Sequence, residues 1–164
     1  MGIHAEIKEP SFIGEAVLLV NDSTSQKLDK EIARFRNSPK LTPDAWVTTT
    51  LTIDTPKANV RVPKGQTPKI IVKANDNESD PMTIINIYKL DAKKNKREVK
   101  IGKSQGSKTN NNTKSLVSFN ADSYGEKSYI IELPNLAPGE YGIIVTNPNG
   151  LDEKRTIVSC FAID

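Results

Sequence analysis

The stretch that decides the fold is Leu136-Ala-Pro-Gly-Glu-Tyr141 running into Gly142-Ile-Ile-Val-Thr146. Proline and glycine set a turn, and the isoleucine, valine and threonine that follow favour a β-strand. The same alternation recurs over residues 46–163, where short runs of Val, Ile, Thr and Tyr end at Pro, Gly, Asn or Asp. Such punctuation predicts an antiparallel all-β domain, built as a two-sheet β-sandwich.

This pattern predicts about nine or ten strands. They are expected over residues 11–20, 46–53, 58–62, 69–75, 82–90, 98–103, 116–119, 127–133, 141–146 and 155–163. Residues 104–113 have almost nothing to bury and are expected to form a mobile surface loop. We expect one domain over residues 11–164 after an N-terminal arm of residues 1–10. Whether residues 11–40 belong to the sandwich or dock on it as an extension stays open.

Residues 24–35 are the ambiguous segment. Leu28, Ile32 and Phe35 have the i, i+4, i+7 spacing of one helix face, behind a possible cap at Asp22 or Ser23. This spacing predicts a short helix near residues 24–35. A strand is the alternative, because tertiary pairing often overrides such short patterns.

The turn quoted above resembles the tyrosine corner of immunoglobulin-like and fibronectin-type sandwiches. The resemblance is carried by Leu136, Pro138, Gly139 and Tyr141 and is confined to the closing strands. It implies that the Tyr141 hydroxyl bonds back to the backbone across the corner while its ring is buried. It implies no activity, and the paired cysteines of antibody domains are missing.

Composition restricts the functional classes. The sequence has 164 residues, a net charge of +3, one cysteine and one histidine, His4. The longest apolar run, residues 16–20, is too short to span a bilayer. We expect no signal peptide, because the first ten residues lack a basic stretch followed by an apolar one, and the lone Cys160 agrees with a reducing compartment. We therefore expect a cytoplasmic or virion protein.

We expect no enzyme, no catalytic residues and no cofactor. A triad or a zinc site needs several histidines or cysteines, and no glycine-rich phosphate loop is present. Asp76, Glu78 and Asp80 form a weak calcium candidate, because carboxylates at alternate positions of a turn can converge on a hard cation. The stronger reading of these residues is an Asx-rich turn before Pro81.

A basic segment is the main electrostatic feature. Residues 89–114 hold nine Lys or Arg against Asp91 and Glu98. This suggests a polyanion or nucleic-acid site, whose candidate residues are Lys93, Lys94, Lys96, Arg97 and Lys100. The alternative is a solvated hairpin tip that discourages edge-to-edge pairing.

Aromatic residues are few, and Trp46, Tyr88 and Tyr124 are the only candidates for a carbohydrate platform. The function we expect is a non-enzymatic protein-interaction or structural module. It would act as a subunit of a homo-oligomer or larger assembly, such as a virion or secretion machine. A carbohydrate- or polyanion-binding sandwich is the alternative.

Several surface segments are expected to carry this role. They are the loop tips of residues 76–81, 93–97, 104–113 and 147–150, together with the arm of residues 1–10.

Overall fold

The computed structural model describes residues 7–147 and 154–164, and these residues form an all-β fold with one short helix. The strands are β1 (Ala16–Leu19), β2 (Ser25–Lys27), β3 (Asp29–Asn37), β4 (Val47–Ile53), β5 (Arg61–Val62), β6 (Lys69–Lys73), β7 (Ile85–Ala92), β8 (Arg97–Gln105), β9 (Lys108–Asn111), β10 (Asn120–Tyr124), β11 (Ser128–Glu132), β12 (Gly139–Val145) and β13 (Arg155–Ile163); the helix is α1 (Pro81–Ile84). The all-β, antiparallel prediction is confirmed, with the β5–β13 pair as a short parallel exception.

The strands divide between a small sheet and a closed one. Sheet A has the order β10-β11-β6-β1-β2, and the eight-stranded sheet B has the order β12-β7-β8-β4-β3-β13-β5, with β9 paired to β8 beside this path. Because β12 also pairs with β13, six of the eight strands, from β12 to β13 in this order, close into a barrel. The prediction of a two-sheet sandwich is therefore confirmed only in part. The sheets are antiparallel and packed on each other, but one of them is a closed barrel.

Closure depends on the last strand. The first part of β13, from Arg155 to Cys160, pairs with β3, while its end, from Ser159 to Ile163, pairs with β12. Gly142 makes the closure sterically possible, since a Cβ at this position would lie 2.7 Å from the Val158 side chain. A long strand shared between two partners therefore turns an open sheet into a barrel.

Two apolar layers hold the molecule together. One lies between sheet A and the barrel, where Ile70 and Ile131 belong to the same cluster as Ile143 and Phe161. The other fills the barrel interior with Leu51, Ile53, Val99, Val158 and Cys160. Burying side chains of this size is worth about 1.5–3 kcal/mol each.

The corner before β12 has the geometry expected for its residues. The Tyr141 hydroxyl donates to the Ala137 carbonyl at 2.6 Å, and the Tyr141 ring stacks on Phe161 with centroids 5.4 Å apart. Leu136 packs against the core between the sheets, and Gly139 adopts a φ of +152°. The corner thus fixes the start of β12 in the layer that joins the two sheets.

The helix predicted near residues 24–35 is wrong, because this segment forms β2 and β3. The physical reason is pairing, since β3 lies between β4 and β13 in the barrel wall. Ile32 is 57% exposed and pairs with Ile157. Leu28, Ile32 and Phe35 therefore do not form one buried face.

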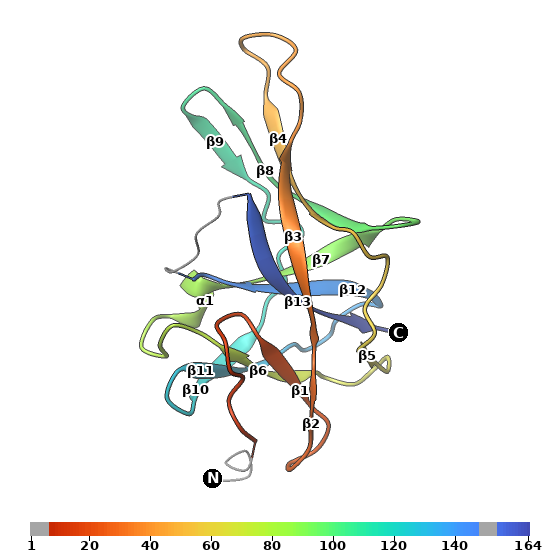
Figure 1. Ribbon diagram of the computed structural model, residues 1–164, viewed down its shortest axis with the longest axis vertical. Coiled ribbons are helices and arrows are strands. Elements are labelled where there is room, and N and C mark those ends of the chain that lie inside the picture. Colours follow the sequence, from red (N-terminus) through yellow and green to blue (C-terminus); the bar gives the residue numbers. More distant parts are fainter. Residues whose placement is uncertain (1–6, 148–153) are drawn as a thin grey trace.

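The prediction of a surface loop over residues 104–113 is also wrong. The segment continues β8 to Gln105, turns at Gly106 and returns as β9. Together, β3, β4, β8 and β9 extend away from sheet A (Figure 1).

In the described part of the chain, no helix is both long enough and apolar enough to cross a bilayer.

Candidate functional site

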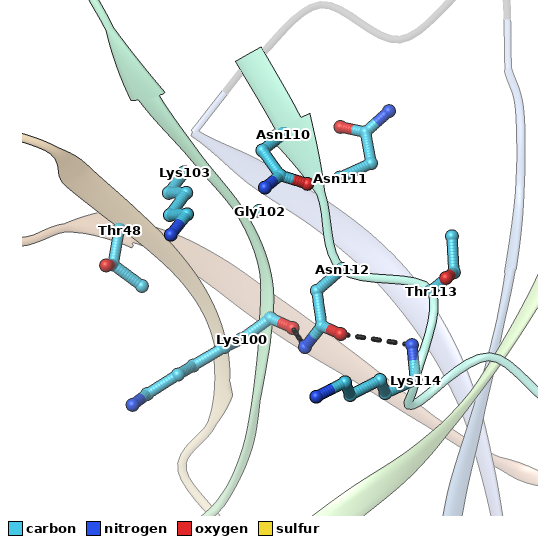
Figure 2. Close-up of a pocket in the computed structure, with 9 residues that line it drawn as sticks. All are labelled: Thr48, Lys100, Gly102, Lys103, Asn110, Asn111, Asn112, Thr113 and Lys114. Carbon is cyan, nitrogen blue, oxygen red and sulfur yellow. Dashed lines mark hydrogen bonds between the residues drawn. The ribbon is translucent and has the colours of Figure 1, made fainter.

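Two adjoining grooves lie on the outer face of β3, β4, β8 and β9, and we call them together the trough. The upper groove (Figure 2) has a volume of about 470 Å³ and is lined by Thr48, Lys100, Gly102, Lys103, Asn110, Asn111, Asn112, Thr113 and Lys114. The lower groove, of about 350 Å³, is lined by Arg36, Asn37, Ser38, Thr48, Thr50, Thr52, Glu98 and Lys100. The grooves share Thr48 and Lys100, so they form one continuous surface.

Strand alternation produces the floor of the trough. Along β4, Leu51 and Ile53 point into the barrel, which leaves Thr48, Thr50 and Thr52 on the outer face. This explains the threonine-rich composition of β4: one face of the strand is polar and the other is core.

A β-bulge in β8 gathers the lysines. Thr49 pairs with Gly102 and Thr50 pairs with Lys100, so Ile101 is the extra residue. Because a bulge shifts the alternation by one, Lys100 and Lys103 share the outer face although they are three residues apart. They lie opposite Thr50 and Thr48.

The β8–β9 hairpin forms the wall of the upper groove. The Asn112 side-chain amide donates to the Lys100 carbonyl at 2.8 Å and accepts from the Lys114 backbone at 3.0 Å (Figure 2). A Cβ at Gly102 would lie 3.1 Å from the Asn110 carbonyl, so the close approach of the two strands favours glycine. The Asn112 hydrogen bonds and the close approach at Gly102 therefore fix the position of β9 against β8.

The trough is positively charged. Its cations are Arg36, Lys100, Lys103 and Lys114, and its single carboxylate is Glu98. Glu98 lies 3.3 Å from Lys96, whereas none of the four cations has a carboxylate within 4.0 Å among the described residues. Lys103 lies over the Trp46 ring, 5.1 Å from its centroid. Within the part of the chain that the structure describes, these four cations thus have no carboxylate partner and can meet an anionic ligand.

The predicted basic candidates are separated by the structure. Lys100 lines both grooves, while Lys93 and Lys94 lie in the exposed β7–β8 turn and Lys96 is paired with Glu98. Arg97 must be corrected, because its side chain is fully buried inside the barrel. The alternation with Val99, two residues on, is the signal that places Arg97 on the inner face.

Arg97 belongs to a buried ion network. Its guanidinium lies 3.4 Å from both Glu31 and Glu140 and donates to the Thr55 carbonyl at 2.9 Å and hydroxyl at 2.7 Å. Glu140 also accepts from the Ala58 backbone at 2.8 Å. Every charge in this network is paired, so its role is structural.

The weak calcium candidate behaves as a turn. Asp76 accepts from the backbone N–H of Glu78 and Ser79, and these bonds hold the pKa of Asp76 below its usual value. Asp80 accepts from the Met82 backbone and caps α1. The described residues contain no group of three His, Cys, Asp or Glu side chains able to hold a metal ion.

The three aromatic candidates do not share an element. Trp46 precedes β4 and is 40% exposed, Tyr88 lies on β7, and Tyr124 lies on β10 of sheet A. The Tyr124 hydroxyl donates to the Ile7 carbonyl.

Burial raises the pKa of the Cys160 thiol to about 12, so this cysteine is held as a neutral thiol.

The described end of the N-terminal arm is docked on sheet A. Ile7 is buried against Val17 and Ile71. Glu9 accepts from Glu126 and Lys127 backbone N–H groups at 3.0 Å and from the Ser128 hydroxyl at 2.6 Å.

Two opposing effects act on the Glu9 carboxyl. Burial raises its pKa, but these hydrogen bonds and Lys73 outweigh that effect and lower the pKa to about 2.

The rest of the arm, with His4, and residues 148–150 of the predicted 147–150 tip lie outside the described residues.

Comparison of the chain with protein-family models, with curated proteins and with solved structures finds no match.

Proposed function

We propose that this chain is a non-enzymatic interaction module that binds a polyanionic partner in the trough. The observation that carries the proposal is the set of four cations, Arg36, Lys100, Lys103 and Lys114, which have no carboxylate partner among the described residues and lie around a surface of hydroxyls and amides. Placing them on one face has an electrostatic cost that an anionic partner removes. No nucleophile or metal enters this role.

Trp46 offers a direct test, because it is the only tryptophan in the chain and lies beneath Lys103. We would titrate the protein with long-chain polyphosphate, a polyanion without sugars or bases, and follow tryptophan emission and heat. We expect saturable binding at low salt that is lost near 0.5 M salt, where the screening length falls to a few ångströms. Absence of both signals at low salt contradicts the proposal.

Self-association is a second candidate, supported by the open strands. In the part of the chain described, β2 and β10 lie at the two ends of sheet A, and β9 pairs only with β8. Such edges present backbone groups that a second chain can pair with. Light scattering over a concentration series, at low and high salt, tests the proposal that the chain is a subunit of a homo-oligomer or larger assembly. A strict monomer at both salts contradicts the homo-oligomer.

Two further proposals concern kinship and compartment. The Tyr141 corner supports an immunoglobulin-like relationship, and the closure of sheet B weighs against it. The single, buried Cys160 supports a reducing compartment such as the cytoplasm, or a virion.

A further inference from the structure

We propose that the ligand of the trough is an acidic polysaccharide, bound through its carboxylate or sulfate groups together with its hydroxyls. This inference rests on the proposed function and narrows its chemical class. It draws on three features: the side chains that line the upper groove, the aromatic residues missing from that lining, and the shape of the trough.

The lining of the upper groove matches a charged sugar. Among the described residues, it consists of lysines, primary amides, threonine hydroxyls and a glycine, without a carboxylate. Lysine ammonium groups only donate hydrogen bonds and suit carboxylate or sulfate oxygens, whereas amides and hydroxyls both donate and accept. Sugar hydroxyls have the same dual character, so the lining complements both parts of an acidic sugar.

Asn110 is the amide placed for this contact. Its side chain is directed toward Gly102 and the middle of the groove (Figure 2). Asn112 is already committed to Lys100 and Lys114, whereas the Asn110 side chain forms no hydrogen bond to any residue that the structure describes. Asn110 therefore has its full hydrogen-bonding capacity available to a ligand.

The same lining suits nucleic acid poorly. Binding of single strands relies on aromatic side chains that stack with bases, and none of the described residues that line either groove is aromatic. Trp46 is nearby, but Lys103 lies over its ring. Of the four cations only Arg36 is an arginine, the residue whose planar fork matches phosphate.

The shape of the trough fits a polymer. It crosses β3, β4, β8 and β9, which corresponds to roughly 14 Å at the usual spacing of strands. Lys100 and Thr48 lie where the two grooves meet. A chain lying across the strands would meet Arg36 toward one end and Lys114 toward the other, which spaces its charges along its length.

The test compares ligands and two matched double variants by calorimetry at low salt. The ligands are heparin, polygalacturonate, neutral dextran and single-stranded DNA. K100Q/K114Q removes two trough charges, and K93Q/K94Q removes two charges from the β7–β8 turn. We expect K100Q/K114Q to weaken polysaccharide binding by roughly tenfold or more, and K93Q/K94Q to leave it within about twofold.

Asn110→Ala separates sugar recognition from charge alone. It changes no charge, and the loss of one hydrogen bond corresponds to about threefold to tenfold in affinity. We expect this loss with the acidic polysaccharide and no change with DNA. Equal effects on both ligands would overturn the sugar assignment.

The outcomes distinguish the two proposals. Binding to heparin or to polygalacturonate with the expected variant pattern supports the inference and identifies sulfate or carboxylate as the group recognised. Tighter trough-dependent binding of DNA overturns the inference and leaves the proposed function standing. No binding of any polyanion, or equal losses in both double variants, overturns both.

Discussion

Arg97 and Lys100 stand three residues apart on β8, yet they occupy opposite sides of the barrel wall. Arg97 is fully buried and paired with Glu31 and Glu140, while Lys100 faces the trough without a carboxylate partner among the described residues. The inner charge is neutralised by two carboxylates, whereas the outer charge is available to a ligand. One strand therefore supplies a stabilising cation on one face and a binding cation on the other.

The largest effect is expected from breaking the inner side. Arg97→Met leaves Glu31 and Glu140 without their shared partner, and removal of one member of a buried ion network costs about 3–5 kcal/mol. Lys100→Met is the matched control on the outer face, and we expect its unfolding free energy to change by less than about 0.5 kcal/mol. Urea denaturation of both variants measures the contrast. Similar losses in the two variants would refute the division of roles.

A paired carboxylate outside the barrel sharpens the comparison. Glu9 has a folded pKa of about 2, below its ordinary value of 4.5. Its stabilising contribution is therefore complete above about pH 4.5 and is lost as the pH falls toward 2. We expect Glu9→Gln to cost about 1–2 kcal/mol at pH 7, after allowance for its partial exposure, and almost nothing near pH 2.

Glu126→Gln provides the control for Glu9, since the Glu126 side chain is exposed on the same turn. Denaturation curves at several pH values between 2 and 7 give the comparison. If Glu9→Gln costs the same at all of them, the carboxylate is not the group that fastens the arm to sheet A.

The wall of the trough gives a smaller effect. Gly102→Ala places a Cβ 3.1 Å from the Asn110 carbonyl and pushes β9 away from β8. We expect a loss of about 1 kcal/mol, at the low end for overpacking, together with faster amide exchange of β9. Gly106→Ala is not a suitable control because Gly106 has a positive φ of 58°, so Thr109→Ser on exposed β9 serves instead.

The smallest stability effect is expected from the trough charges themselves. K100Q/K114Q should leave the melting temperature within about 2 °C, because exposed, unpaired lysines contribute little to folding. A clear rise in stability on removing them would show that their mutual repulsion is substantial. A clear fall would show that they have partners within the fold.

Much of the fold follows from local patterns in the sequence. The turn at Pro138 and Gly139, the run into β12 and the long β13 are visible as turn residues and β-branched runs. The closure of the barrel is not, because it depends on which strands pair, and β3 and β13 are separated by more than a hundred residues. The helical spacing at Leu28 and Ile32 led to a wrong prediction for the same reason: strand pairing with distant parts of the chain decides the structure of this segment.

The candidate site was predictable only in part. Charge density alone pointed to the segment of β8 that lines the trough and to Lys100, but it grouped Arg97 with the lysines although strand alternation puts it inside. The bulge at Ile101, which brings Lys103 to the outer face, has no sequence signal that we can identify. Arg36 joins the trough from a strand distant in the sequence, so only the fold reveals it.

The position of β13 in the barrel also bears on how the chain folds during synthesis. β3 is synthesised more than a hundred residues before β13, its partner on one side. Until β13 emerges, β3 and β12 have exposed edges and the barrel interior is open on one side. Contacts between residues so far apart slow folding and prolong exposure of apolar surface. Pairing of β13 thus closes the barrel, and nascent chains in which β13 has not yet emerged should depend most on chaperones.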